Sequence, residues 1–153
     1  MEEINMIGIG CDHGGFELKE AVRKHLEEQG IEYRDFGSYT PERCDYPVVA
    51  EAVARAVVAG EVDKGILVCG TGIGVSIAAN KVMGIRAALC GDCYSAEYTR
   101  RHNDANILTM GARVTGSGLA CKIVDTFLST GFDGSYHADR VALISDIERR
   151  ERA

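Results

Sequence analysis

The sequence predicts an α/β fold in which a parallel sheet is covered by helices on both faces. Short apolar segments rich in β-branched residues alternate five times with longer amphipathic segments, and this alternation is typical of β-α-β units. The central segment 64–69 is apolar over Gly-Ile-Leu-Val-Cys, as expected for a strand buried on both sides. Right-handed crossovers between such strands give a doubly wound sheet.

The elements follow one another at regular intervals. The predicted strands span 6–11, 32–36, 64–69, 85–90 and 107–110, and the predicted helices span 16–29, 47–59, 75–81, 92–102 and 117–128. Gly30 and Gly60 directly follow the first two helices, at a position where glycine commonly ends a helix. A charged helix over 139–150 follows the last round and is expected to leave the sheet.

Length and composition limit the possible functions. The 153 residues fit one domain, 1–153, with no linker-like segment. A net charge of −6 argues against nucleic acid as a partner. There is no apolar run of membrane-spanning length and the start, 1–5, is acidic, so no membrane partner and a cytoplasmic location are expected. In that compartment the cysteines are expected to be reduced: Cys11, Cys44, Cys69, Cys90, Cys93 and Cys121.

A glycine-rich loop follows the third predicted strand. Gly70, Gly72 and Gly74 let main-chain N–H groups approach an anionic ligand. The loop lacks the Lys-Ser/Thr of a nucleotide-triphosphatase loop, and Val75 replaces the last glycine of the dinucleotide fingerprint. A binding loop and a purely structural turn therefore both remain possible on the local pattern.

Cys69 ends that strand directly before the loop. Main-chain N–H groups there are expected to favour the thiolate, the nucleophilic and basic form of cysteine. Cysteine is also one of the most frequently buried residues, so a packing role stays open as well.

Other polar residues lie near predicted strand ends. Asp12 and His13 follow the first strand, and His102 and Asn103 close the fourth helix, so we expect these two groups to share one sheet edge. Arg113, His137 and Arg140 are cations that, with His13, are expected to surround a dianion. The Cys90-Gly91-Asp92-Cys93 segment lacks a second ligand pair, so no metal site is predicted.

Four segments together resemble the type B ribose-5-phosphate isomerases, within the ribose, allose and galactose-6-phosphate isomerase family. These segments are Cys11–Phe16, Asp45–Pro47, Cys69–Lys81 and Arg101–Asn106. The resemblance implies a Rossmann-like three-layer sandwich with a five-stranded parallel sheet and an extra C-terminal helix. It also implies a homodimer or homotetramer with shared active sites, and neither metal nor cofactor.

The resemblance further implies roles for individual residues. Cys69 matches the base that moves a proton between C1 and C2, and the N–H groups from Gly70 to Gly74 match those that hold the enediolate oxygen. Thr71 and His102 match residues that assist ring opening, with His102 supplied by the neighbouring subunit. The remaining matches are to substrate-binding positions: Asp12 and Tyr46 for the sugar, His13, Arg113, His137 and Arg140 for the phosphate, and Asn103 for the substrate in general.

One position departs from the family pattern. Tyr136 stands where many relatives carry an arginine, so one phosphate contact is lost and the length of the substrate is left open. A ribose 5-phosphate isomerase is the leading hypothesis, and an isomerase of allose 6-phosphate, galactose 6-phosphate or a tetrose phosphate is the alternative. A noncatalytic sugar-phosphate-binding subunit and a flavodoxin-like nucleotide-binding module represent different functional classes.

Overall fold

The computed structural model describes residues 6–153, so the prediction about the acidic segment 1–5 lies outside the described residues. In chain order the elements are β1 (Ile7–Cys11), the short 3₁₀ helix η1 (His13–Gly15), α1 (Phe16–Glu28), β2 (Tyr33–Asp35), α2 (Tyr46–Val58), β3 (Lys64–Cys69), α3 (Ile73–Ala79), β4 (Ala87–Leu89), α4 (Cys93–Asn103), β5 (Ile107–Gly111), α5 (Ser117–Ser129) and α6 (Tyr136–Glu151).

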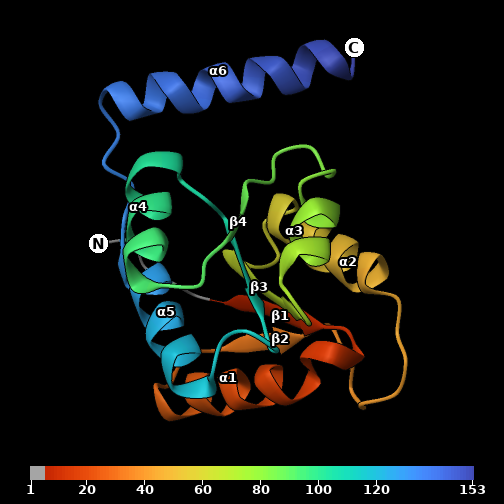
Figure 1. Ribbon diagram of the computed structural model, residues 1–153. Helices are drawn as coiled ribbons and strands as arrows, with labels where there is room; N and C mark the ends of the chain where they lie inside the picture. Colours follow the sequence, from red (N-terminus) through yellow and green to blue (C-terminus); the bar gives the residue numbers. More distant parts are fainter. Residues whose placement is uncertain (1–5) are drawn as a thin grey trace.

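The strands form one parallel sheet of five, in the order β2-β1-β3-β5-β4. Helices α1, α4 and α5 pack on one face, and α2 and α3 pack on the other (Figure 1). Each face has its own cluster of buried apolar side chains, because β1, β3 and β5 are buried along their whole length. The predicted doubly wound three-layer fold is therefore confirmed.

The strand order reverses between β1 and β3. The chain passes from β1 outward to β2 and then returns to β3 on the other side of β1. Ligands of doubly wound sheets bind beyond the carboxyl ends of the strands at this reversal. The residues that follow Cys11 and those that follow Cys69 meet there.

Two predicted boundaries differ from the structure. α3 begins at Ile73, two residues earlier than expected, because Gly72 with φ +80 turns the chain directly into the helix. β4 covers only Ala87–Leu89 of the predicted 85–90. It is an edge strand, and the main-chain N–H of Arg86 donates to the Asn106 side chain (2.8 Å) instead of joining the ladder.

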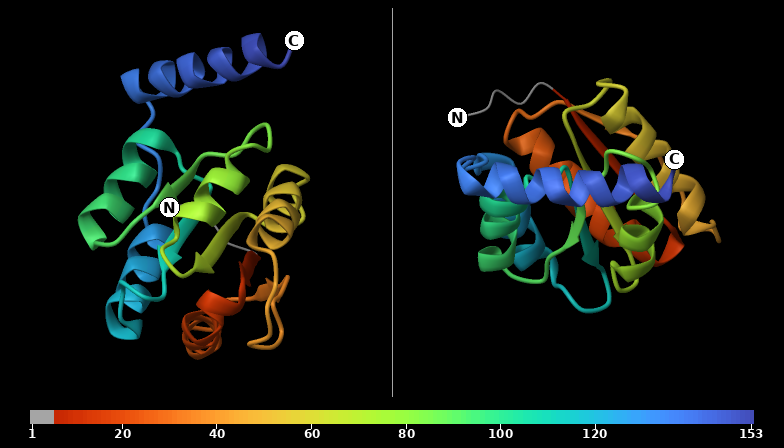
Figure 2. Two further views of the ribbon diagram at one scale, coloured as in Figure 1. Left: turned by 45° about the vertical axis from the view of Figure 1, so that its right-hand side comes forward. Right: turned by 90° about the horizontal axis from the view of Figure 1, so that it is seen from above.

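α6 leaves the sheet, as predicted, and begins three residues before the expected position 139. It packs against α4, and Figures 1 and 2 show most of its length standing away from the other layers. His137 is buried, whereas Leu143, Ile144 and Ile147 are exposed. No helix among residues 6–153 has the length and apolar character needed to cross a membrane.

Candidate active site

The Cys69 thiol lies beneath the glycine loop at the end of β3. It is 5% exposed, and its Sγ accepts a hydrogen bond from the main-chain N–H of Gly72 (3.1 Å). This bond requires glycine at position 72, because φ is +80 and a Cβ there would lie 2.7 Å from the carbonyl carbon of Met110. The loop therefore turns a main-chain N–H donor back onto the sulfur.

The other cysteines lie in different environments. The sulfur atoms of Cys11, Cys44 and Cys90 lie near main-chain carbonyl oxygens, and burial raises the pKa of each of these three thiols. Burial raises the pKa of Cys11 and of Cys90 to about 11. Among the cysteines, all of which lie within residues 6–153, Cys69 is the one whose sulfur is seen accepting a main-chain N–H.

Asp12 and His13 follow the carboxyl end of β1, Asp12 as the N-cap of η1 and His13 as its first residue. The buried carboxylate of Asp12 accepts the main-chain N–H of Gly15 (3.1 Å), so it caps η1. The Nδ1 atom of His13 accepts the main-chain N–H of Cys44 (3.2 Å). Its proton is therefore carried on Nε2, which leaves the exposed imidazole with a donor for a ligand.

Tyr46 and Arg113 flank the glycine loop. A Cβ on Gly74 would lie 2.7 Å from Cε1 of Tyr46, so the ring rests directly on the loop. The guanidinium of Arg113 lies beside Gly70, 3.5 Å from the Cβ position of that residue. Arg113 is exposed and supplies a cation next to the loop.

Two open cavities, of about 550 and 540 Å³, have His13 in both of their linings. The first also includes Asp12 and Tyr46, and the second includes Arg113. Thr71 is exposed on the loop, where its hydroxyl accepts the main-chain N–H of Ile73 (3.2 Å). One chain therefore brings together a thiol, main-chain donors, an imidazole and a guanidinium at the predicted edge.

The other predicted site residues lie at the opposite edge of the sheet, the one formed by the amino ends of the strands. α4 starts after the carboxyl end of β4 and runs back antiparallel to the strands, so its last residues, His102 and Asn103, reach the amino ends. The Arg86 side chain, just before β4, donates to the carbonyl of Asn103 (2.9 Å). The expectation that His102 shares an edge with Cys69 within one chain is wrong, because a crossover helix carries the chain back across the sheet.

His137 and Arg140 join His102 at this second edge. The imidazoles of His102 and His137 stack with their centroids 3.9 Å apart, and the Tyr136 ring lies 4.2 Å from that of His137. Arg140 sits over Tyr136, with Cζ 4.9 Å from the ring centroid. Burial lowers the pKa of His137, and the nearby cations His102 and Arg140 act in the same direction. The four cations expected around one dianion are therefore divided between two edges.

Sequence reasoning missed two residues near these groups. Arg43 lines the same cavity as Asp12 and His13. It could have been predicted as a site residue because it is a cation only three residues before Tyr46. Asp133 lies beside His102 and His137. In the sequence, an acidic residue four positions before His137 only weakly indicates that the two side chains are close.

Comparison with known proteins places this arrangement among sugar-phosphate isomerases. The family model described as Ribose/Galactose Isomerase matches residues 7–144. The Escherichia coli protein named ribose-5-phosphate isomerase B is 53% identical over 94% of this chain and 97% of its own length.

Two further similarities extend this comparison. The solved structure of Clostridium thermocellum ribose-5-phosphate isomerase B has 53% sequence identity and a TM-score of 0.94, covering 95% of this chain and 99% of that one. A D-erythrulose-4-phosphate isomerase from Pectobacterium atrosepticum is 43% identical over 95% of this chain and 97% of its own length.

Proposed function

Because the chain belongs to the ribose/galactose isomerase family and is an aldose–ketose isomerase, we propose that it interconverts D-ribose 5-phosphate and D-ribulose 5-phosphate. The main structural support for this reaction is the hydrogen bond of 3.1 Å from the Gly72 N–H to the Cys69 sulfur, at the carboxyl end of the central strand β3. The arrangement supplies a base, and the neighbouring loop supplies donors for an oxyanion.

In this proposal Cys69 acts as thiolate on the opened sugar. The thiolate takes the proton from C2, the electron pair moves into the C1–C2 bond, and the carbonyl electrons pass to O1. The Cys69 thiol, whose proton exchanges with solvent while the enediolate is bound, then delivers a proton to C1 as the hydroxyl proton on O2 is transferred to O1, which gives the ketose. Charge on oxygen is larger in the enediolate-like transition state than in substrate, so main-chain donors from Gly70 to Gly74 accelerate the reaction.

Ring opening needs an acid and a base before proton transfer can occur. We assign this step to Thr71 together with His102 from a second copy of the chain. Asp12 and Tyr46 contact the sugar, with Asn103 of the second copy. The phosphate is held by His13 and Arg113 from one copy and by His137 and Arg140 from the other.

A two-copy site is supported by the separation of the two residue groups to opposite sheet edges. The exposed side chains of Ile144 and Ile147 line an apolar groove of about 560 Å³ between α6 and the β4 side of the sheet. Exposed apolar patches on a soluble protein commonly mark association sites. We therefore propose a homodimer, closed by two-fold symmetry, as the smallest active unit.

Tyr136 is the reason for considering substrates other than ribose 5-phosphate. Its ring holds Arg140 at 4.9 Å and contacts His137 at 4.2 Å, so an aromatic side chain stands among the proposed phosphate ligands. In a sugar phosphate of another length, the phosphate lies at a different distance from C1 and C2 than in ribose 5-phosphate. The relative named D-erythrulose-4-phosphate isomerase has a substrate of this kind in its name. Tetrose phosphates and hexose 6-phosphates are therefore the alternatives to ribose 5-phosphate.

A substrate panel tests both parts of the proposal. Isomerisation of ribose 5-phosphate, allose 6-phosphate, galactose 6-phosphate and erythrulose 4-phosphate is measured with the parent, Cys69→Ala and Cys69→Ser. We expect ribose 5-phosphate to have the highest kcat/KM and Cys69→Ala to lower kcat by about a thousandfold or more while sugar-phosphate binding persists. Faster turnover of another sugar would reassign the substrate, and near-parental turnover by Cys69→Ala would reassign the base.

Exchange of solvent deuterium into C2 separates an enzyme from a noncatalytic binding subunit. Folded parent protein that binds the sugar phosphate without any exchange would contradict the proposed function. A cytoplasmic location belongs to the same proposal, because the mechanism needs Cys69 reduced.

A further inference from the structure

We infer that His102, Asp133 and His137 form a binding site for a divalent metal ion of the Zn²⁺ type, and that the bound ion inhibits the isomerase by occupying His102. The inhibition rests on the proposed role of His102, whereas binding of the ion does not. The ion takes no part in the reaction itself.

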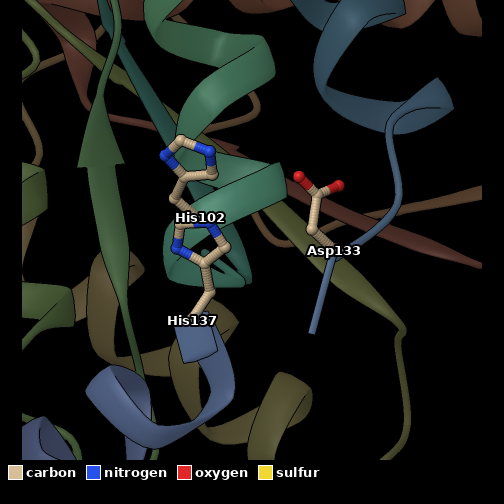
Figure 3. A group of neighbouring side chains, drawn as sticks. All are labelled: His102, Asp133 and His137. Carbon is tan, nitrogen blue, oxygen red and sulfur yellow. The ribbon is translucent and has the colours of Figure 1, made fainter. Parts of the chain in front are cut away.

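The three side chains come from separate segments and lie close together in Figure 3, with the two imidazoles stacked and the carboxylate beside them. His102 lies in the last turn of α4, His137 in the first turn of α6, and Asp133 in the connection that precedes α6. One ligand atom from each residue lies within 4.8 Å of the others. Two imidazoles and a carboxylate are a donor set that zinc uses in three-ligand sites with an open fourth position.

Small side-chain rotations complete the coordination. Zinc bonds of about 2.0–2.1 Å place tetrahedral ligand atoms about 3.4 Å apart, so ligand atoms that now lie up to 4.8 Å apart must approach by up to about 1.4 Å. The His102 ring must also rotate out of its stack on His137 so that a lone pair from each ring meets one ion. His102 is half-buried and Asp133 is exposed, so both can move, while buried His137 provides the fixed ligand.

The main chain holds the three residues near one another before an ion arrives. The N–H of Asp133 donates to the carbonyl of Arg101 (3.0 Å), which fastens the connection to the end of α4. The N–H of His137 donates to the carbonyl of Gly134 (3.0 Å), which closes the turn into α6. Binding therefore does not require ordering of a loop, and its entropic cost is small.

Two arginines set the electrostatic balance. The Nε of Arg101 lies 3.1 Å and 3.3 Å from the carboxylate oxygens of Asp133, and Arg140 is close enough to His137 to influence it. Both cations repel a metal ion, and Arg101 also competes with the ion for the Asp133 carboxylate. Removal of the guanidinium of Arg101 should therefore strengthen the site, whereas removal of the Asp133 charge should weaken it.

The test measures metal binding directly, with Co²⁺ absorption and Zn²⁺ calorimetry on the full chain. The parent is expected to bind one ion per chain at this site, with a tetrahedral Co²⁺ spectrum and without the sulfur-to-cobalt band that a cysteine ligand would add. Asp133→Asn should weaken binding by about tenfold or more. Arg101→Gln breaks the same ion pair but retains the carboxylate, so it should bind as tightly as the parent or more tightly.

Isomerase assays with Zn²⁺ or a chelator complete the test. Asp133→Asn should keep the parental rate in chelator and lose most of the Zn²⁺ inhibition. A parent that binds no ion here, or equal weakening by Asp133→Asn and Arg101→Gln, would overturn the site. Binding without inhibition would overturn the inhibitory role, and a parent that binds Co²⁺ but turns over no sugar phosphate would contradict the proposed function while leaving the site intact.

Discussion

At the scale of single residues, the chemistry depends on how the glycine loop approaches Cys69. Gly72 combines a left-handed backbone with contacts on two sides, since a Cβ would lie 2.5 Å from Leu89 Cδ1 and 2.7 Å from the Met110 carbonyl carbon. Its N–H is the donor to the Cys69 sulfur. The position of that donor therefore depends on the absence of a side chain.

Replacement of Gly72 by alanine should reduce both stability and activity. A left-handed alanine costs about 1–2 kcal/mol, and the clash with backbone atoms that cannot move freely adds to it. We expect the free energy of unfolding, measured with denaturant, to fall by about 2 kcal/mol or more, together with kcat. Gly91→Ala is the matched control, because nothing lies within 4 Å of its Cβ position; equal effects of the two substitutions would contradict the argument.

At the scale of elements, a buried lysine joins α1 to the segment after β2. The Lys19 side chain is fully buried, and its ammonium donates to the carboxylate of Asp35 (2.8 Å) and to the carbonyl of Ser38 (2.7 Å). This segment continues to Cys44, whose N–H holds His13, and to Tyr46 at the start of α2. The ion pair therefore supports one wall of the candidate site.

Lys19→Met should destabilise the protein, because it leaves the Asp35 carboxylate and the Ser38 carbonyl without this donor. Breaking a buried ion pair by removal of one partner costs about 3–5 kcal/mol. Because Asp35 is partly exposed, we expect the free energy of unfolding to fall by about 3 kcal/mol, the lower end of that range. Lys24→Met, on the exposed side of the same helix, should change stability by less than about 0.5 kcal/mol. A chemical denaturation series on both variants measures the difference, and a neutral Lys19→Met would show that the pair contributes nothing.

At the scale of the whole molecule, the proposed active site is divided between two copies. The residues near Cys69 lie at the carboxyl edge of the sheet, and those near His102 lie at the amino edge. Two surfaces at opposite edges of one chain meet only when two chains associate.

The expectation of a single domain spanning 1–153 stays a prediction.

Mixing two inactive variants tests this division. Cys69→Ala and His102→Ala homodimers should each be inactive. After subunit exchange half of the dimers are mixed, and each mixed dimer has one complete site, so about a quarter of the parental activity should return. A mixture of Cys69→Ala with Thr71→Val, which disables the same edge twice, should stay inactive; failure of the first mixture despite confirmed exchange would place the whole site within one chain.

Much of the fold followed from local patterns in the sequence. The β3 segment, for example, was predicted with its exact bounds because consecutive apolar residues end at a glycine loop. β4 was overestimated, since an edge strand has one partner and the main-chain N–H just before it, from Arg86, bonds to the Asn106 side chain instead. α6 began earlier than predicted because buried His137 stacks on His102 of α4, a contact that a surface-helix pattern does not reveal.

The sequence by itself determined the parallel sheet, the glycine loop and the cysteine that precedes it, because each depends on residues adjacent in the chain. Only the tertiary structure decided which residues face one another. The direction of α4 separates His102 from Cys69, and the turn before α6 brings Asp133 to the two histidines. These contacts depend on the direction in which distant segments cross the sheet, and the spacing of residues along the chain does not predict that direction.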